Sequence, residues 1–338
     1  MACASSQVPT IGEINFYGLF KVTPERILKA LKLQPGERLT ASRAEMQDRL
    51  EEVSGVVLSH VEAVCCDGSR TILFIGVEER GEPHAAFRSD PGGSAVLPPQ
   101  LIDAYDDFLA AVTHAAAQGR STEDLTAGHS MMDDPQAWAV QNRFLEIARR
   151  NLTLLRDVLH DGSEPGQRAI AAALIGYAPN KSEVINDLQY ALTDPDESVR
   201  ANALRSLTAI AVLASREPAL GLHIPPTWMV ELLNSVVLGD RVESVKALLA
   251  LTGGGASGPA PGPESQAALD LIRERALHSV VEMARWTTPS YALPPFLLAG
   301  RLAGMSYVDT LQAWANGDHA AVLDRLLTGR KKSGATLQ

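Results

Sequence analysis

The stretch Asp194-Pro-Asp-Glu-Ser-Val-Arg-Ala201 decides the fold, because copies of it recur along the chain. One copy begins at Asp240 and reads Asp-Arg-Val-Glu-Ser-Val-Lys-Ala, and a fainter copy begins at Asp161. In each copy an acidic turn residue precedes a basic residue by six or seven positions, and an Ala-rich apolar helix follows. Self-similarity of this kind is typical of a solenoid, in which each repeat packs on its neighbours and presents a surface for binding.

Paired helices are predicted around these copies. The helix that ends at 160–161 is predicted to pair with 167–177. The further predicted pairs are 182–192 with 197–214, 227–238 with 242–251, 273–286 with 294–302, and 306–315 with 318–327. Residues 100–330 are therefore expected to be helical, with the clearest repeats over 155–253. The Gly/Pro-rich stretch 252–263 predicts a surface loop between repeats, and 331–338 a disordered tail.

The composition narrows the kind of partner. The 338 residues include 46% apolar but only 5% aromatic residues, and the formal net charge is −10. An acidic chain lacks the basic surface that binding to nucleic acids or anionic lipids requires. The sequence also contains no run of 18 apolar residues, the length needed to span a membrane. We therefore expect a protein or peptide partner, no nucleic acid and no membrane span.

The three cysteines predict neither a disulfide framework nor a metal site. Cys3, Cys65 and Cys66 are too few for the first and wrongly spaced for the second. Because neighbours on a strand point to opposite faces, Cys65 and Cys66 are expected to remain thiols, one buried and one exposed.

Residues 11–80 predict a separate α+β module with the order β-α-α-β-β, after a disordered tail over 1–10. A strand is expected over 14–20, Thr23 and Pro24 begin a helix, and Ser42 caps a second helix. Asp67-Gly68 then joins two β-rich stretches as a hairpin turn.

This module resembles a POTRA domain in the segments Ile14-Asn-Phe-Tyr-Gly18, Leu33-Gln-Pro-Gly36, Leu50-Glu-Glu-Val-Ser-Gly55 and Ile75-Gly-Val-Glu-Glu79. The resemblance implies helices on one face of the sheet, protein binding by strand addition, and a place in a bacterial cell envelope. If the inner hairpin strand pairs with the first strand, then 56–64 is a free edge. The candidate partner-binding residues on that edge are Val57, Ser59, Val61 and Ala63. The alternative is that a neighbouring domain covers it.

Residues 81–99 read as a linker or an irregular wrap, because they contain four prolines and three glycines. A helix is expected over 101–117, and Asp134 with Pro135 begins a longer helix that bends near Asn151. The His and Asp residues of this region match no metal-ligand spacing and are expected to be exposed or capping residues: His114, His129, Asp133, Asp134 and His160.

The repeats resemble HEAT repeats, and the resemblance implies an all-α right-handed solenoid. It also implies a structural ladder in which acidic and basic positions bond between adjacent repeats, setting register more than stability. The residues that carry it are Asp161, Asp194, Asp240, Arg168, Arg200 and Lys246, with the apolar Val199 and Val245. The alternative is that the three basic residues form a stripe for an acidic ligand.

No motif for catalysis is present. The chain has no phosphate loop, no Gly-x-Ser-x-Gly elbow and no Cys-x-x-Cys pair. We therefore predict a non-enzymatic protein-binding scaffold or adaptor with no cofactor and no metal, periplasmic or exported if a signal peptide was removed and otherwise cytoplasmic. Two alternatives stay open: a cytosolic HEAT-repeat adaptor, and a lyase or other enzyme with an active site in the groove, which a perturbed carboxylate or His cluster there would favour.

Overall fold

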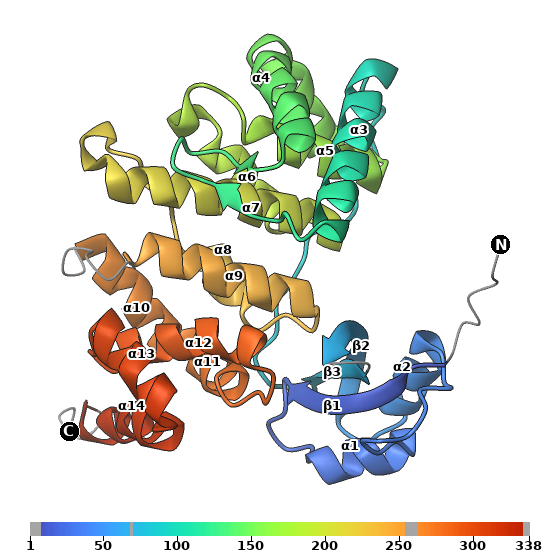
Figure 1. Ribbon diagram of the computed structural model, residues 1–338, viewed down its shortest axis with the longest axis vertical. Helices are drawn as coiled ribbons and strands as arrows, with labels where there is room; N and C mark the ends of the chain where they lie inside the picture. The colour runs from blue at the N-terminus through green and yellow to red at the C-terminus, as the bar shows by residue number, and fades with distance from the viewer. Residues whose placement is uncertain (1–7, 68–69, 254–262, 334–338) are drawn as a thin grey trace. The chain divides into compact units, whose positions relative to one another are not determined.

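The computed structural model describes residues 8–67, 70–253 and 263–333 (Figure 1). The chain divides into two compact units. The first unit contains Met1–Ala85, Glu231–Val242 and Leu271–Gln338, and the second contains Ala86–Val230 and Glu243–Asp270. The first unit therefore combines segments from both ends of the sequence.

The first unit begins with a three-stranded sheet and two helices, in the β-α-α-β-β order that the sequence predicts. The strands stand in the order β1-β3-β2, with β1 parallel and β2 antiparallel to β3. The elements are β1 (Thr10–Tyr17), α1 (Pro24–Leu31), α2 (Arg43–Glu51), β2 (Val56–Asp67) and β3 (Arg70–Glu79).

Helices α1 and α2 cover the same face of this sheet, as predicted (Figure 1). One apolar core joins Ile27 and Leu31 of α1 to Met46 and Leu50 of α2 and to Ile75 of β3. Local signals fix where the helices begin: α1 starts at Pro24 after Thr23, and Ser42 forms a capping box with Glu45 at the start of α2.

The opposite face of the sheet is covered by helices from the end of the chain, α11 (Leu277–Met283) and α12 (Pro289–Leu302), together with the turn between them. The ring of Phe74 on β3 lies 5.0 Å from that of Trp286 and 4.7 Å from that of Tyr291. A Cβ at Gly76 would lie 2.2 Å from the ring of Tyr17, so only glycine leaves room for that tyrosine on this face. The sheet is thus buried on both sides.

Two further helices pack on α12 in the first unit, α13 (Tyr307–Asn316) and α14 (His319–Ser333). They form the last predicted pair. The structure extends α14 through Ser333, so the predicted disordered tail from 331 is wrong for its first three residues, and the remainder of that tail lies outside the described residues.

The second unit is built from helices that stack in pairs. Helix α4 packs on α5 and α6 on α7, while α5 packs on α7 and α4 on α6, so two antiparallel pairs form adjacent repeats (Figure 1). The helices are α3 (Pro99–Ala117), α4 (Pro135–Asp161), α5 (Pro165–Ile175), α6 (Ile185–Ala191) and α7 (Glu197–Arg216). As predicted, Asp134 caps α4, and the helix loses its helical dihedral angles at Asn151.

The border between the two units falls within three helices, α8 (Thr227–Leu232), α9 (Leu238–Leu251) and α10 (Pro263–Arg275). The short elements of the second unit are β4 (Glu123–Asp124), β5 (Met131–Met132), η1 (Lys181–Glu183) and η2 (Pro218–Leu220). Most of the predicted loop 252–263 lies outside the described residues. Across the described ranges, no helix combines the length and the apolar character needed to cross a bilayer.

Candidate functional site

One rung of the predicted ladder joins α5 to the turn before α7. Arg168 is fully buried and donates to both carboxylate oxygens of Asp194 at 2.9 Å, a bidentate pair. Its other N–H groups reach the carbonyls of Gly162 and Ser163 at 3.0 and 3.2 Å and the carboxylate of Asp90 at 3.0 Å. Asp161 lies exposed at the end of α4 instead, and the acids bonded to Arg168 are Asp194 and Asp90.

The arginines of successive repeats bond the backbone in the same way. Arg200 donates to the carbonyls five and six residues before it, at 2.9 and 2.8 Å, as Arg168 does. Arg241 is almost fully buried and donates to the carbonyl of Ser235, six residues before it, at 2.5 Å. The third basic position of the repeat is therefore Arg241.

The assignment of Lys246 to the ladder is wrong. Lys246 is 52% exposed and pairs with Glu243 inside α9 at 2.7 Å. The cause is the start of the helix: α9 begins at Leu238, so Asp240 lies in its first turn and not in the turn before it. Asp240 is buried there and accepts a hydrogen bond from the Ser235 hydroxyl at 2.7 Å.

The segment 86–98 is a wrap along the ladder rather than a linker. The N–H of Arg88 donates to the carbonyl of Thr193 at 2.8 Å, and its guanidinium bonds Asp194. The ring of Phe87 lies 3.9 Å from the guanidinium carbon of Arg200. The predicted basic stripe is thus occupied at Arg168 and Arg200 by groups of the chain itself.

The predicted free edge is occupied at one of its four residues. Strand β2 lies at the edge of the sheet, but the N–H of Ser59 donates to Glu51 at 3.1 Å and its carbonyl accepts from Gln47 at 3.0 Å. These two side chains of α2 take the backbone groups that a partner strand would need, so the free-edge prediction is wrong at Ser59. Val61 is buried in the core, whereas Val57 and Ala63 are exposed.

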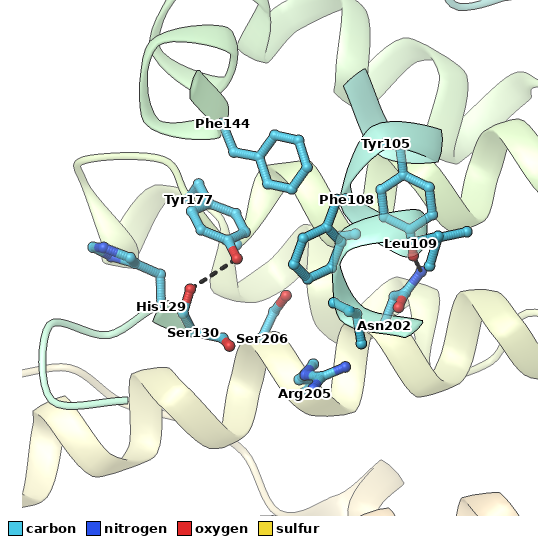
Figure 2. Close-up of a pocket in the computed structure, with 13 residues that line it drawn as sticks. Tyr105, Phe108, Leu109, His129, Ser130, Phe144, Tyr177, Asn202, Arg205 and Ser206 are labelled. Carbon is cyan, nitrogen blue, oxygen red and sulfur yellow. Dashed lines mark hydrogen bonds between the residues drawn. The ribbon is translucent and has the colours of Figure 1, made fainter. Parts of the chain in front are cut away.

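A pocket of about 180 Å³ lies in the second unit, between α3, α4, α5, α7 and the loop before α4. Figure 2 shows the rings of Tyr105, Phe108, Phe144 and Tyr177 along one part of its wall, and Asn202, Arg205 and Ser206 along another. The other lining residues are Leu109, Val112, His129, Ser130, Ala173 and Gly176. A wall of aromatic and other apolar side chains with a few polar groups is the usual make-up of a ligand pocket.

The aromatic rings pack on one another and are fixed by hydrogen bonds. Phe144 lies 5.4 Å from Phe108 and 5.3 Å from Tyr177 between ring centres, both edge to face. The amide of Asn202 donates to the hydroxyl of Tyr105 at 3.0 Å and to the carbonyl of Ala169 at 2.8 Å. The wall is therefore formed before any ligand binds.

The loop that closes the pocket is held by Gln141, which is fully buried on α4. Its amide donates to the carbonyl of Ser130 and to the hydroxyl of Tyr177, both at 2.9 Å, and accepts from the N–H of Met132 at 2.7 Å. Tyr177 also donates to the Ser130 carbonyl at 2.8 Å (Figure 2), and burial raises the pKa of its hydroxyl. The loop is thus fixed to α4 and to Tyr177, which follows α5.

Two groups with shifted pKa values lie beside this loop. Burial lowers the pKa of Lys181 to about 8, and burial together with the Lys181 ammonium lowers the pKa of His129 to about 4. His129 is therefore partly buried and neutral at pH 7, not exposed as predicted. The residue that could have indicated this burial from the sequence is Gly128. Its φ of +76° and its close approach to Leu213 fold the loop inward.

The described residues contain no cluster of three or more His, Cys, Asp or Glu side chains that could hold a metal ion. Cys65 is disulfide-bonded, so the prediction of two free thiols is wrong for this residue. The side chains of the other two cysteines lie outside the described part of the chain.

No protein-family model and no curated protein matches this chain. Among solved structures it is similar to the designed armadillo repeat protein YIII(Dq.V1)4CPAF in complex with peptide (KR)4, with 18% identity and a TM-score of 0.35 over 58% of this chain and 93% of the other. A second, designed armadillo repeat protein YIII(Dq)4CqI, gives 16% identity and a TM-score of 0.34 over 60% and 98%. Both scores lie below 0.5, so the helical-repeat architecture rests on the helix pairing described above.

Proposed function

We propose that this protein is a non-enzymatic scaffold that binds a protein or peptide through the aromatic pocket of its helical repeats. The observation that supports this most directly is the size and lining of that pocket. A cavity of about 150 Å³ with apolar walls accepts benzene, and this pocket of about 180 Å³ is walled by four aromatic side chains. It therefore fits a single aromatic or large aliphatic side chain, the kind of anchor that dominates binding energy at interfaces.

The repeats give such an anchor a rigid frame. Gly176, at the end of α5, and Ser206 on α7 meet so closely that a Cβ on the glycine would lie 2.3 Å from the Ser206 hydroxyl. The pocket wall between these two helices cannot shift without separating them. A preformed wall lowers the entropy cost of binding, which favours a recognition site over an empty packing defect.

The proposal is tested by selecting peptides from a random display library on the full chain. We expect the selected peptides to share an aromatic or large aliphatic position. Ala173→Phe, which fills the pocket from α5, should abolish their binding. Ala116→Phe, the same change on an exposed part of α3, should leave binding intact. Peptides that bind the Ala173→Phe protein as well as the wild type would place the binding surface elsewhere.

An enzyme is the second candidate, and one observation favours it. Lys181 and His129 combine a buried amine of low pKa with a neutral imidazole beside a pocket, and such groups can act as nucleophile and base. If Lys181 acts as a nucleophile, its amine condenses with a carbonyl compound, releasing water, and borohydride then reduces the imine to a stable adduct. Trapping of pyruvate on Lys181, absent in Lys181→Met, would support this candidate.

We also propose, from the POTRA-like order of elements in the first module, that the protein is located in a bacterial cell envelope. This proposal is independent of the binding function. It is tested by expressing the natural gene in its own cells and fractionating them. Recovery of the protein only with the cytoplasm would leave the alternative of a cytosolic adaptor.

A further inference from the structure

A second pocket, of about 420 Å³, adjoins the aromatic pocket, and His129 and Tyr177 line both. Lys181 lines this second pocket and is only 7% exposed. Its ammonium donates to the carbonyl of Gly176 at 2.7 Å and lies 3.5 Å from Nδ1 of His129. Both partners are neutral, and Lys181 forms no ion pair with any carboxylate in the part of the chain that the structure describes.

A buried ammonium without an acidic partner is costly, because burial removes its hydration. The carbonyl end of α5, at Gly176, offsets part of the charge, since a helix C-terminus carries about half a negative unit. An ammonium has three N–H donors, however, and only one of them makes a short hydrogen bond here. The remaining donors lack an acceptor of opposite charge.

The other charged groups that line the pocket are paired or neutral. Glu146 pairs on the exposed surface of α4 with Arg149, at 2.8 Å, and with Arg150, and His129 is neutral. The pocket therefore has one unbalanced positive charge, that of Lys181. One carboxylate would balance it.

We infer that Lys181 binds a carboxylate of the same partner whose apolar side chain enters the adjoining aromatic pocket. This rests on the proposed function and adds to it the chemistry of the ligand: an acidic group next to an aromatic or large aliphatic one. The carboxylate can be that of a chain terminus or that of an aspartate or glutamate side chain.

The probes are N-acetyl-L-phenylalanine, which carries a ring and a carboxylate, and its amide, which lacks the charge. Their dissociation constants are measured by NMR titration of the full chain. We expect the acid to bind about tenfold more tightly than the amide, as a charge-assisted hydrogen bond gives. Lys181→Met, of similar length but uncharged, should remove that difference. Arg143→Gln, which removes an exposed cation of α4 that lines neither pocket, should leave it unchanged, and circular dichroism checks that each variant is folded.

Two amidated dipeptides, with aspartate before or after phenylalanine, distinguish a side-chain carboxylate from a terminal one.

The pH dependence of binding gives an independent test of the role of Lys181. Between about pH 7 and pH 9, Arg149 and Glu146 stay charged, and His129 and Tyr177 stay neutral, so only Lys181 changes its charge among the groups that line this pocket. The preference for the acid should therefore fall across this range in the wild type and be absent throughout in Lys181→Met.

The outcomes separate this inference from the function on which it rests. Equal binding of acid and amide by the wild type would overturn the carboxylate site and leave the aromatic pocket standing. Binding of the acid that is lost in Lys181→Met but kept in Ala173→Phe would support the carboxylate site and refute the aromatic one. Absence of binding by every probe would overturn both.

Discussion

The indole N–H of Trp286 donates to the carbonyl of Phe16 at 2.8 Å, across a sequence separation of 270 residues. Its ring packs edge to face on Tyr17 and Phe74. Around this contact, Glu282 accepts the N–H groups of Gly18 and Leu19 at 2.7 and 3.0 Å. The end of β1 is therefore held by residues from the last quarter of the chain.

Replacing Trp286 by phenylalanine should destabilise the protein by about 1–3 kcal/mol, because the Phe16 carbonyl loses its donor and the smaller ring leaves space. The free energy of unfolding in urea measures this. Trp138→Phe is the matched control, since Trp138 is 51% exposed and should change stability by under about 0.5 kcal/mol. Similar effects of the two changes would mean that Trp286 does not anchor β1.

Arg168→Ala should cost about 3 kcal/mol, because it removes the bidentate partner of a fully buried carboxylate. This loss of stability lies at the lower end of the range expected for breaking a buried ion pair, because Arg88 still neutralises Asp194. Arg143→Ala, which breaks an exposed pair with Asp107, should cost less than about 1 kcal/mol. Equal midpoints in thermal unfolding would show that the ladder contributes nothing to stability.

Two glycines, one in the first turn of α5 and one just after its end, should respond in opposite directions to the same change. Gly176→Ala places a Cβ within 2.8 Å of Cβ of Ser206 and should destabilise the repeat by about 1–3 kcal/mol. Gly166→Ala meets nothing within 4 Å in the first turn of the helix and should stabilise it by about 0.5–1 kcal/mol. A stable Gly176→Ala protein would indicate that α5 and α7 can move apart.

The low pKa of His129 predicts a loss of stability in mild acid. Its pKa falls from 6.5 to about 4 on folding, so the unfolded chain binds more protons than the folded chain between these values. Stability is complete above pH 6.5 and falls as the pH decreases toward 4. Urea unfolding of the wild type and of His129→Gln at several pH values measures this. A constant difference between the two proteins across the range would contradict the prediction.

Local signals predicted the starts of several helices well, whereas the first strand, predicted over 14–20, begins at Thr10, the last residue of the predicted tail. Ser42 and Asp134 cap helices, Asn151 interrupts α4, and the β-α-α-β-β order follows from alternation and turn residues. These features depend on neighbours in the sequence, where capping and turn chemistry act. The pairing of Arg168 with Asp194 was predictable in kind, because an acid and a base recur at each turn.

The third repeat shows where sequence similarity misleads. Residues 242–246, Val-Glu-Ser-Val-Lys, copy the start of α7, yet α9 begins four residues before them. No proline or glycine marks the true turn before Leu238, and the buried Ser235 hydroxyl that bonds Asp240 there has no signature of its own. The copy was therefore aligned five residues too late, on Lys246 instead of Arg241.

The pocket could be predicted only in part. The helix over 101–117 that supplies part of its wall was predicted, but Lys181 at the start of η1 and His129 in the loop before α4 approach each other only through tertiary packing. The burial of the second face of the sheet also could not be predicted from the sequence, because no local pattern indicates the contact between Phe74 and Trp286.

The cover of that second face has a consequence for synthesis. About 200 residues separate Ala85 from Trp286, so at roughly 5–20 residues per second the finished strands wait about 10–40 s on the ribosome for the helices that cover them. During that interval Phe74 and Tyr17 are open to solvent and to other nascent chains. Chaperone binding to the nascent chain should therefore be strongest before the last helices emerge. A ribosome stalled before Trp286 should carry a sheet whose apolar second face is exposed.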